Sequence, residues 1–399
     1  MRLLLHDFAG HPFPAQLARA LAGRGLEVDH ASCSGVATGR GDLARRPDDP
    51  PTLRFTDVSS AAFERYSPVK RLASEARYGV RLARHVRRTR PDVVLSGNTP
   101  LLAQAALWAA AASTGATRVF WVQDFLGRGT RAVLAARSPL LGRTLGAGLE
   151  RLETTLLRRS DHAIVITDDF VAELARRSVT VPTTVVENWA PLDEIPLEPK
   201  DNPWSRAHGL HERPVALYSG TLGLKHDPGH LVAAAERLRG TGARLVVVTE
   251  GRGRDALEAA RTTGGLDEVL VLLDYVPYAD FPRVLGAADI TLVLLEEEAG
   301  TFSVPSKVLA YLAAGRPVVA AMPADNLATT TVERAGAGVV TRPGDHAAFA
   351  EAVADLLADD ARRAAAGAGA RAHATATFDI EVIADRIGAV VGQPRSSRS

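Results

Sequence analysis

The sequence predicts an α/β protein of two doubly wound domains, in which helices cover both faces of a parallel sheet. Short apolar runs that end in Gly, Asn, Pro or Asp alternate with Ala-, Leu- and Arg-rich segments, the order typical of strand–helix–strand units. A stretch rich in Pro, Asp and Glu interrupts this alternation at residues 188–213, after which the alternation begins again. The length of 399 residues allows two domains, each with its own core.

The first domain is expected over residues 1–190. Its opening segment, MRLLLHDFAG, has no long apolar run and therefore predicts a strand rather than a signal peptide. The expected strands are Leu3–Leu5, Leu26–His30, Val93–Ser96, Arg118–Val122, Ala163–Ile166 and Thr183–Val186. The expected helices include Pro14–Ala22, Lys70–Arg88 and Ser138–Arg159.

A linker is expected at residues 191–212 and the second domain at 213–375. A last helix at 376–391 is a candidate for packing back on the first domain, and a disordered tail is expected at 392–399. The expected strands of the second domain are Val215–Ser219, Arg244–Thr249, Val269–Leu272, Ile290–Leu295, Pro317–Ala320 and Gly338–Thr341. The expected helices include Gly229–Leu238, Asp280–Ala287, Ser306–Ala314 and His346–Leu357.

Composition narrows the functional classes. Apolar residues make up 46% of the chain and charged residues 23%, which excludes a disordered chain. The single cysteine, Cys33, excludes a disulfide framework or a cysteine-rich zinc site and fits a reducing compartment. The most apolar stretch, residues 101–116, is too short and too polar to span a bilayer. We therefore expect a cytoplasmic protein, either free or peripheral on the inner face of the membrane.

Positive charge is concentrated in residues 1–190, which carry 26 Lys and Arg against 18 Asp and Glu. Much of the excess falls at residues 65–90, on a predicted helix. Its arginines are either a solvated face or a surface for anionic lipid or a lipid-diphosphate acceptor. A pI of about 8.0 is low for a nucleic-acid-binding protein, so no nucleic-acid partner is expected. The buried face of this helix is expected to carry Val69, Leu72, Ala76, Val80 and Ala83.

Two glycine-containing turns in the second half suit a phosphate. The turn SGTLGLK, residues 219–225, follows a predicted strand; its glycines allow close approach of the backbone, and Lys225 brings a positive charge. Gly251 and Arg252 follow the next predicted strand, although short turns of this kind often use glycine for geometry alone.

A third segment, SVPSK at residues 303–307, opens a predicted helix with Ser306 as its N-cap. The free N–H groups at a helix N-terminus suit a diphosphate. Of the four lysines in the chain, Lys225 and Lys307 fall in these two segments. This placement indicates that compact positive charges are needed there, unless it arises by chance.

These segments resemble a known family. The C-terminal domain of the retaining family-4 glycosyltransferases of the GT-B class is similar to three segments of this chain: PSKVLAYLAAGRPVVA, SGTLGLK and VLLDYVPYADFPRVLGAADITLVLL. The colanic-acid and fucosamine transferases of bacterial surface polysaccharide synthesis are similar to three segments of the first half: AGHPFPAQLARALAGRGLEVDH, VFWVQDFLG and LRRSDHAIVITDDF. The resemblance covers nearly the whole chain. It implies two Rossmann-like domains that face a cleft, with the acceptor on the N-terminal domain and a nucleoside-diphosphate sugar on the C-terminal domain.

The resemblance also implies roles for donor-binding residues. Lys225 matches the lysine that neutralises the donor diphosphate. The arginine usually paired with it is Thr221 here, so part of that charge must come from elsewhere, and Arg252 and Lys307 are the candidates. The family's paired glutamates are Phe302 and Ala310 in this chain. The expected donor contacts are Gly10, Gly220, Thr221, Gly223, Gly251, Arg252, Val276, Ser303, Val304, Pro305, Ser306 and Lys307.

Ribose recognition is affected by the missing glutamates. It falls either to backbone groups or to a glutamate of residues 296–298, unless these three form a solvated acidic run. Val276 lies in the loop where the family contacts the base through the main chain.

On the N-terminal side, the resemblance places His11 in the loop under the donor phosphates, where it lines the cleft or is structural. Gln123 occupies the position where the family commonly has a His that meets the reacting sugar, and Asp124 orients the acceptor hydroxyl or caps the next turn. The expected catalytic residues are Lys225, His11 and Asp124, and the expected acceptor contacts are Asn98, Thr99 and Gln123.

The function expected from this resemblance is hexosyl or aminohexosyl transfer with retention and without a metal ion or cofactor. Cleavage of the anomeric C–O bond leaves negative charge on the phosphate, which Lys225 and the helix N-terminus would stabilise. UDP is the expected nucleotide, and the acceptor is a glycan, a lipid-linked precursor or a small molecule. The alternatives are a transferase that acts on a small secondary metabolite, a nucleotide-sugar epimerase, and a non-catalytic sugar-binding protein.

Overall fold

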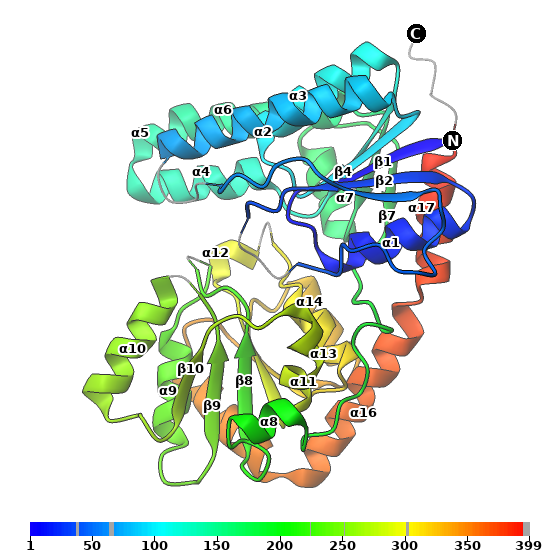
Figure 1. The fold of residues 1–399 in the computed structure, drawn as a ribbon. Helices are drawn as coiled ribbons and strands as arrows, with labels where there is room; N and C mark the ends of the chain where they lie inside the picture. Colours follow the sequence, from blue (N-terminus) through cyan, green and yellow to red (C-terminus); the bar gives the residue numbers. More distant parts are fainter. Residues whose placement is uncertain (37–39, 64–67, 224, 251, 301–302, 394–399) are drawn as a thin grey trace. The chain divides into compact units, whose positions relative to one another are not determined.

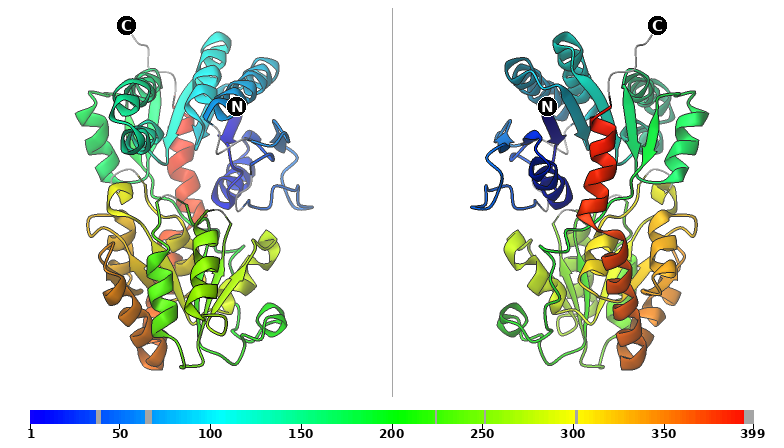
Figure 2. Two further views of the ribbon diagram at one scale, coloured as in Figure 1. Left: turned by 90° about the vertical axis from the view of Figure 1, so that its left-hand side faces the viewer. Right: turned by 90° about the vertical axis from the view of Figure 1, so that its right-hand side faces the viewer.

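A computed structural model of the chain describes residues 1–36, 40–63, 68–223, 225–250, 252–300 and 303–393. Its contacts divide the chain into unit 1, Met1–Asn188 with Ile380–Ser399, and unit 2, Trp189–Asp379. Each unit contains a parallel sheet with helices on both of its faces (Figure 1, Figure 2). The predicted class, α/β with two doubly wound parallel sheets, is therefore confirmed.

The sheet of unit 1 has seven parallel strands in the order β3-β2-β1-β4-β5-β6-β7. Its strand order reverses between β1 and β4, and doubly wound sheets bind ligands at the carboxyl ends of the strands beside such a reversal. The edge strand β3 is absent from the sequence prediction because its run LRFTD buries only Leu53 fully. The strands are β1 (Arg2–Asp7), β2 (Glu27–Ser32), β3 (Leu53–Asp57), β4 (Val93–Gly97), β5 (Thr117–Val122), β6 (His162–Val165) and β7 (Thr183–Val185).

Helices connect these strands and cover the sheet. The predicted helix Ser138–Arg159 is divided into a short α-helix, a π-helical turn and a longer α-helix. The C-terminal helix α17 packs against α1, where Arg24 Nε lies 2.9 Å from Asp385 Oδ1. The helices of unit 1 are α1 (Pro12–Gly23), α2 (Pro68–Thr89), α3 (Leu101–Thr114), α4 (Leu126–Arg137), α5 (Pro139–Leu141), η1 (Gly142–Gly146), α6 (Ala147–Arg158), α7 (Asp168–Arg176) and α17 (Ile380–Val391).

Helix α2 presents a different face to the core from the one predicted. Leu82 and Val86 are buried, whereas Leu72 and Val80, expected in the core, are 38% and 47% exposed. The cause is close packing on α3: a Cβ atom on Gly79 would lie 3.0 Å from the α3 backbone, so the glycine face turns inward. The remaining members of the predicted face are Ala83, which is buried, Ala76, which is exposed, and Val69, whose side chain lies outside the described part.

The sheet of unit 2 has six parallel strands in the order β10-β9-β8-β11-β12-β13, and it reverses between β8 and β11. Apolar side chains fill both of its faces, which is why the uninterrupted apolar runs predict these strands within about one or two residues. The strands are β8 (Val215–Ser219), β9 (Arg244–Val248), β10 (Leu270–Leu273), β11 (Ile290–Leu294), β12 (Val318–Ala321) and β13 (Gly338–Thr341).

The segment predicted as a linker packs as part of unit 2. Ile195 and Leu210 are buried, and Asn202 caps α8 through a reciprocal pair of hydrogen bonds with Ser205. Residues 394–399, most of the predicted disordered tail, lie outside the described part. The helices of unit 2 are α8 (Pro203–Ala207), α9 (Gly229–Arg237), α10 (Arg252–Gly264), η2 (Tyr278–Asp280), α11 (Phe281–Gly286), α12 (Glu297–Gly300), α13 (Lys307–Ala313), α14 (Leu327–Arg334), α15 (His346–Ala358) and α16 (Asp360–Thr377).

Among the residues that the structure describes, no helix combines the length and the apolar character needed to cross a bilayer.

Candidate functional site

The turn after β8 lies at the reversal of the unit 2 sheet. Gly220 has a φ of +138°, a conformation that favours glycine. Its N–H donates to the Val248 carbonyl at 3.0 Å, and its own carbonyl accepts from the Thr249 hydroxyl at 2.7 Å. These two hydrogen bonds join the turn to the carboxyl end of β9.

Two lysines from distant segments meet around this turn. Lys225 Nζ donates to Ser303 Oγ at 3.0 Å, and Lys307 Nζ lies 3.6 Å from the centroid of the Tyr218 ring. A Cβ atom on Gly220 would lie 3.2 Å from Lys307 Nζ, so glycine is what allows this lysine to approach the backbone. Within the described ranges, the buried Nζ of Lys307 has no hydrogen-bond partner. Burial lowers the pKa of Lys307 to about 7.

Aromatic and imidazole side chains hold the rest of the turn. Thr221 Oγ1 lies 2.8 Å from the Tyr275 hydroxyl, and the Thr221 carbonyl accepts from the Tyr218 hydroxyl at 2.9 Å. The Gly223 N–H donates to His226 Nδ1 at 3.1 Å. Burial, followed by the charges of the two lysines, lowers the pKa of His226 to about 3, so its ring is neutral and can accept this bond. Half-buried Val276 follows Tyr275 in the loop after β10.

The segment before α13 differs from the prediction in one respect. Ser306 stands at the N-cap position, but it has helical backbone angles and its side chain makes no capping hydrogen bond in the described part of the chain. The reason is that the backbone already turns at Pro305, whose carbonyl accepts from the Val308 N–H at 3.3 Å. Ser303 is buried, and Val304 is half-buried beside it.

Three further donor-side predictions are placed as follows. Gly251 lies outside the described residues, and Arg252 begins α10 with its side chain outside them. Glu296 accepts the Asp227 N–H on Oε1 at 3.0 Å, so its carboxylate braces the chain beyond Lys225. Glu297 and Glu298 lie in the short helix α12.

A histidine and an aspartate pair at the carboxyl end of β1 in unit 1. His11 Nδ1 lies 3.0 Å from both Asp7 carboxylate oxygens, and the His11 backbone N–H lies 2.5 Å from Asp7 Oδ2. Although its burial opposes ionisation, the neighbouring His11 holds the pKa of Asp7 well below its usual range. Burial likewise opposes the imidazolium, but the Asp7 carboxylate, followed by that of Asp124, raises the pKa of His11. Gly10, with a φ of +73°, makes the turn that brings the two side chains together.

The acceptor-side residues are partly built into the fold. Asn98 donates from Nδ2 to Asp7 Oδ1 at 3.3 Å and so belongs to the His11 cluster. Thr99 is buried, and its hydroxyl contacts His6 Nδ1 and the Gly97 carbonyl, each at 3.0 Å, which gives it a structural role. The acceptor role of Thr99 stays a prediction.

The turn after β5 carries the other two predicted residues. Buried Gln123 accepts on Oε1 from Asn188 Nδ2 at 2.5 Å. The N-cap of α4 is Phe125, so Asp124 immediately precedes the cap, and both interpretations of Asp124 stay predictions. The charge of Asp124 acts on His11.

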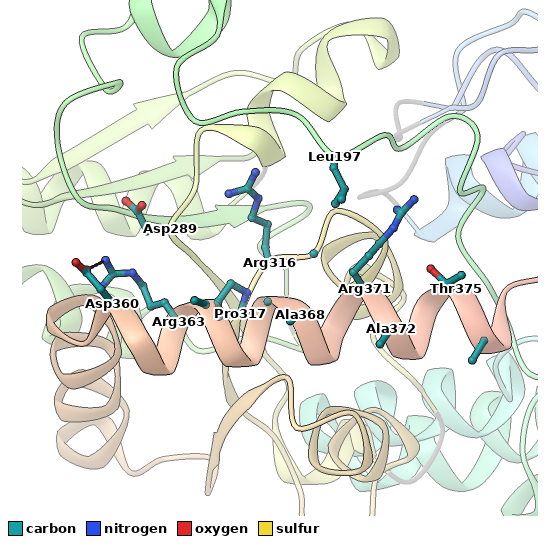
Figure 3. Close-up of a pocket in the computed structure, with 14 residues that line it drawn as sticks. Leu197, Asp289, Arg316, Pro317, Asp360, Arg363, Ala368, Arg371, Ala372 and Thr375 are labelled. Carbon is teal, nitrogen blue, oxygen red and sulfur yellow. Dashed lines mark hydrogen bonds and ion pairs between the residues drawn. The ribbon is translucent and has the colours of Figure 1, made fainter.

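A pocket of about 810 Å³ lies at the amino ends of strands in unit 2, beside the residues that precede β11 and β12 (Figure 3). Three arginines line it, but Arg316 and Arg371 donate to backbone carbonyls, and Arg363 donates to carbonyls and to Asp360. Arg363 and Arg371 thereby tie α16 to the rest of unit 2, and Arg316 ties the turn before β12 to the Ala288 and Glu198 carbonyls. The pocket is therefore not the predicted site.

Each unit thus concentrates polar groups at the carboxyl ends of its central strands: two lysines in unit 2 and a carboxylate-supported imidazole in unit 1. The lysines suit a diphosphate, and the imidazole suits a hydroxyl or an anion. The supporting residues Asp7, Tyr218, His226 and Tyr275 are absent from the sequence prediction. Only the spacing of Asp7 and His11 across a glycine could have indicated a pair.

Two successive parallel-sheet units, each with candidate ligand-binding groups at the carboxyl ends of its strands, define a protein of the GT-B class. The fold is similar to sucrose-phosphate synthase from Thermosynechococcus elongatus, with a TM-score of 0.73, 17% identity and 98% of each chain covered. It is also similar to HepE of Anabaena in complex with UDP and glucose, with a TM-score of 0.72, 16% identity, and 99% of this chain and 100% of HepE covered.

The family follows from the sequence. The model described as "Glycosyl transferases group 1" matches residues 213–359, and the model described as "Glycosyl transferase 4-like domain" matches residues 11–189. The chain therefore belongs to the group 1 glycosyltransferases, and the family predicted from the motifs is confirmed.

Two curated relatives illustrate the range of this similarity. WbjE of Pseudomonas aeruginosa, described as a probable glycosyltransferase, is 25% identical over 70% of this chain and 69% of its own. A GDP-mannose-dependent monoacylated alpha-(1-6)-phosphatidylinositol monomannoside mannosyltransferase of Corynebacterium glutamicum is 30% identical over 38% of this chain and 40% of its own.

Proposed function

We propose that this glycosyltransferase moves a hexosyl or aminohexosyl group, with retention, from a nucleoside-diphosphate sugar to a hydroxyl of a glycan or lipid-linked precursor. UDP is the nucleotide we favour, because HepE, of similar fold, binds UDP and glucose. The relative from Corynebacterium glutamicum acts on a phosphatidylinositol mannoside, which favours a lipid-linked acceptor. No cofactor takes part, and no metal ion acts at the reacting atoms.

The observation that carries this proposal is the pair of ammonium groups at the Gly220 turn. Lys225 is oriented by Ser303, and Lys307 Nζ lies close to the backbone of Gly220, where a Cβ atom would lie 3.2 Å from it. A diphosphate bound at this turn would meet both charges. The family's arginine is replaced by Thr221, so Lys307 supplies the second positive charge.

The reaction then needs little covalent chemistry from the protein. As the anomeric C–O bond breaks, its electron pair and negative charge pass to the leaving phosphate, which the two ammonium groups stabilise. The acceptor oxygen forms the new bond on the same face of the sugar, and the departing phosphate takes the hydroxyl proton. His11, held in one orientation by Asp7, hydrogen-bonds the reacting sugar or the acceptor.

A nucleotide screen tests the proposed donor. Of UDP, GDP, dTDP and CMP, UDP is expected to raise the melting temperature most, because a ligand that binds only the folded state stabilises it by mass action. Differential scanning fluorimetry with uridine as the control separates diphosphate binding from base binding. A larger shift with GDP would identify GDP rather than UDP as the donor nucleotide. The absence of a shift with all four nucleotides would contradict a nucleotide site.

Substitutions on the exposed face of α2 test the proposal of a lipid-linked acceptor. Leu72 and Val80 lie exposed on the same helix as a series of arginines, an arrangement suited to anionic lipid. Each basic residue near such a surface adds about 1 kcal/mol, so the combined change of Arg84, Arg87 and Arg88 to Glu is expected to weaken vesicle binding at least tenfold.

Co-flotation with vesicles that contain phosphatidylglycerol measures this effect, and high salt should reduce it. The matched control reverses three exposed arginines of unit 2, Arg334, Arg342 and Arg362. If the wild-type chain does not float with these vesicles, the lipid surface is wrong and a small-molecule acceptor is favoured.

A further inference from the structure

Three potential metal ligands gather where α9 and α15 begin, in a part of unit 2 that the proposed reaction does not use. They are Asp227, in the loop before α9, His230, in the first turn of α9, and His346, the first residue of α15. Their ligand atoms all lie within 4.8 Å of one another. Helices α9 and α15 pack together, so the cluster is fixed by the core of the unit.

The carboxylate of Asp227 is oriented toward both imidazoles. Its Oδ1 accepts the Gly229 N–H at 2.8 Å, which fixes the side chain. Its Oδ2 lies 2.6 Å from His346 Nε2 and 3.8 Å from His230 Nδ1. One oxygen is thus held by the backbone, and the other lies between two ring nitrogens, the arrangement by which an outer hydrogen bond positions a metal ligand.

His230 is the unexplained member of this cluster. It is 1% exposed, and within the described residues neither of its ring nitrogens makes a hydrogen bond of ordinary length; its polar neighbours are the Asp227 backbone and the Asp227 carboxylate, whose Oδ2 lies 3.8 Å from Nδ1. A neutral imidazole has one donor and one acceptor, and leaving both unpaired in the interior is unfavourable. The ion pair between Asp227 and His346 satisfies the polar groups of those two residues but leaves the ring nitrogens of His230 without a close partner. Its ring packs edge-on against His346, with 4.4 Å between the ring centroids.

We propose that Asp227, His230 and His346 bind one divalent transition-metal ion, with Zn²⁺ as the favoured species. Two imidazole nitrogens and one carboxylate oxygen are a donor set that zinc accepts, with a fourth position left for water. The ion would give the buried His230 nitrogen the partner it lacks. No metal ligands are predicted from the sequence, because His346 lies on a helix far along the chain from Asp227 and His230.

The proposed metal ion has a structural role rather than a catalytic one. Asp227 follows Lys225 by two residues, so a metal ion would tie the chain beyond the Gly220 turn to α15. A Cβ atom on Gly229 would lie 2.8 Å from His346 Cε1, so the glycine leaves the room that the histidine uses. The metal site itself does not depend on the proposed glycosyl transfer; only this effect on Lys225 does.

Zinc binding by the full-length chain tests the proposal. After removal of metals with EDTA, the wild-type chain is titrated with Zn²⁺ by isothermal calorimetry, in competition with a chromophoric chelator. One equivalent should bind tightly and raise the melting temperature. Asp227→Asn and His346→Gln should each weaken this equivalent at least 100-fold, because loss of a ligand exceeds the roughly 10–100-fold cost of losing an outer-shell partner. His208→Asn, which removes an exposed imidazole elsewhere in unit 2, should bind as the wild type does.

Asp227→Asn keeps an oxygen that accepts the Gly229 N–H, so this variant is expected to fold. If His346→Gln does not fold, Asp227→Asn alone decides the result. Circular dichroism of the metal-free proteins checks the fold. Equal zinc affinity in the wild type and in Asp227→Asn, or no tight equivalent in the wild type, would overturn the site. Because the readout is zinc rather than sugar transfer, such a failure says nothing against the proposed activity.

Discussion

Replacement of Lys225 by Ala is expected to lower turnover by about 10²–10³ while acceptor binding stays unchanged. The ammonium group acts most strongly when the leaving phosphate gains charge, so its loss raises the barrier more than it weakens ground-state binding. Ser303 orients Lys225 through the 3.0 Å hydrogen bond, which means that the charge is positioned before the donor arrives. Preorganised charges of this kind need no rearrangement during the reaction.

Release of the nucleoside diphosphate, measured with the donor identified by the nucleotide screen, checks this prediction. Lys70→Ala is the matched control, because Lys70 is an exposed lysine of unit 1 outside the candidate site. Ser303→Ala should have a smaller effect than Lys225→Ala, since the ammonium remains but is less well oriented. Near-wild-type turnover of Lys225→Ala would reject its assigned role.

The strands of both sheets other than β3 follow from the sequence because their signal is local. Buried parallel strands are uninterrupted apolar runs, and β8 and β13 have the predicted bounds. The features that the sequence does not indicate depend on contacts with other segments of the fold. β3 is an edge strand with one fully buried residue, and the inward face of α2 is chosen by contact of Gly79 with α3. Neither property is visible in the periodicity of one segment.

The candidate site divides in the same way. Gly220 and Lys225 are predictable because a glycine turn after an apolar strand is a local pattern, and Lys307 stands out because lysine is rare in this chain. The ring of Tyr218 beneath Lys307 is not predictable, since the contact joins residues from different strands and helices. The same holds for the support of His11 by Asp7, which requires the positive φ of Gly10.

The affinity for UDP is expected to fall as the pH rises above 7, by up to tenfold per pH unit and about 100-fold at most between pH 7 and 9. Burial lowers the pKa of Lys307 to about 7 in the free protein, and a bound diphosphate favours the protonated lysine. Below pH 7 the lysine is already charged, so binding costs no proton. Above pH 7 the lysine must take up a proton to bind, which weakens the affinity until the pH passes its pKa in the complex. The terminal phosphate of UDP, with a second pKa near 6, is fully ionised over this range and does not contribute.

Isothermal titration in buffers of different ionisation enthalpy measures both the affinity and the proton uptake. Lys307→Met keeps the length and apolar stem of the side chain but removes the charge, so its affinity should be low and nearly independent of pH. The wild type should approach the affinity of this variant at pH 9. A flat profile in the wild type, or the same slope in Lys307→Met, would show that another group carries the charge. The second positive charge of the site would then have to come from Arg252.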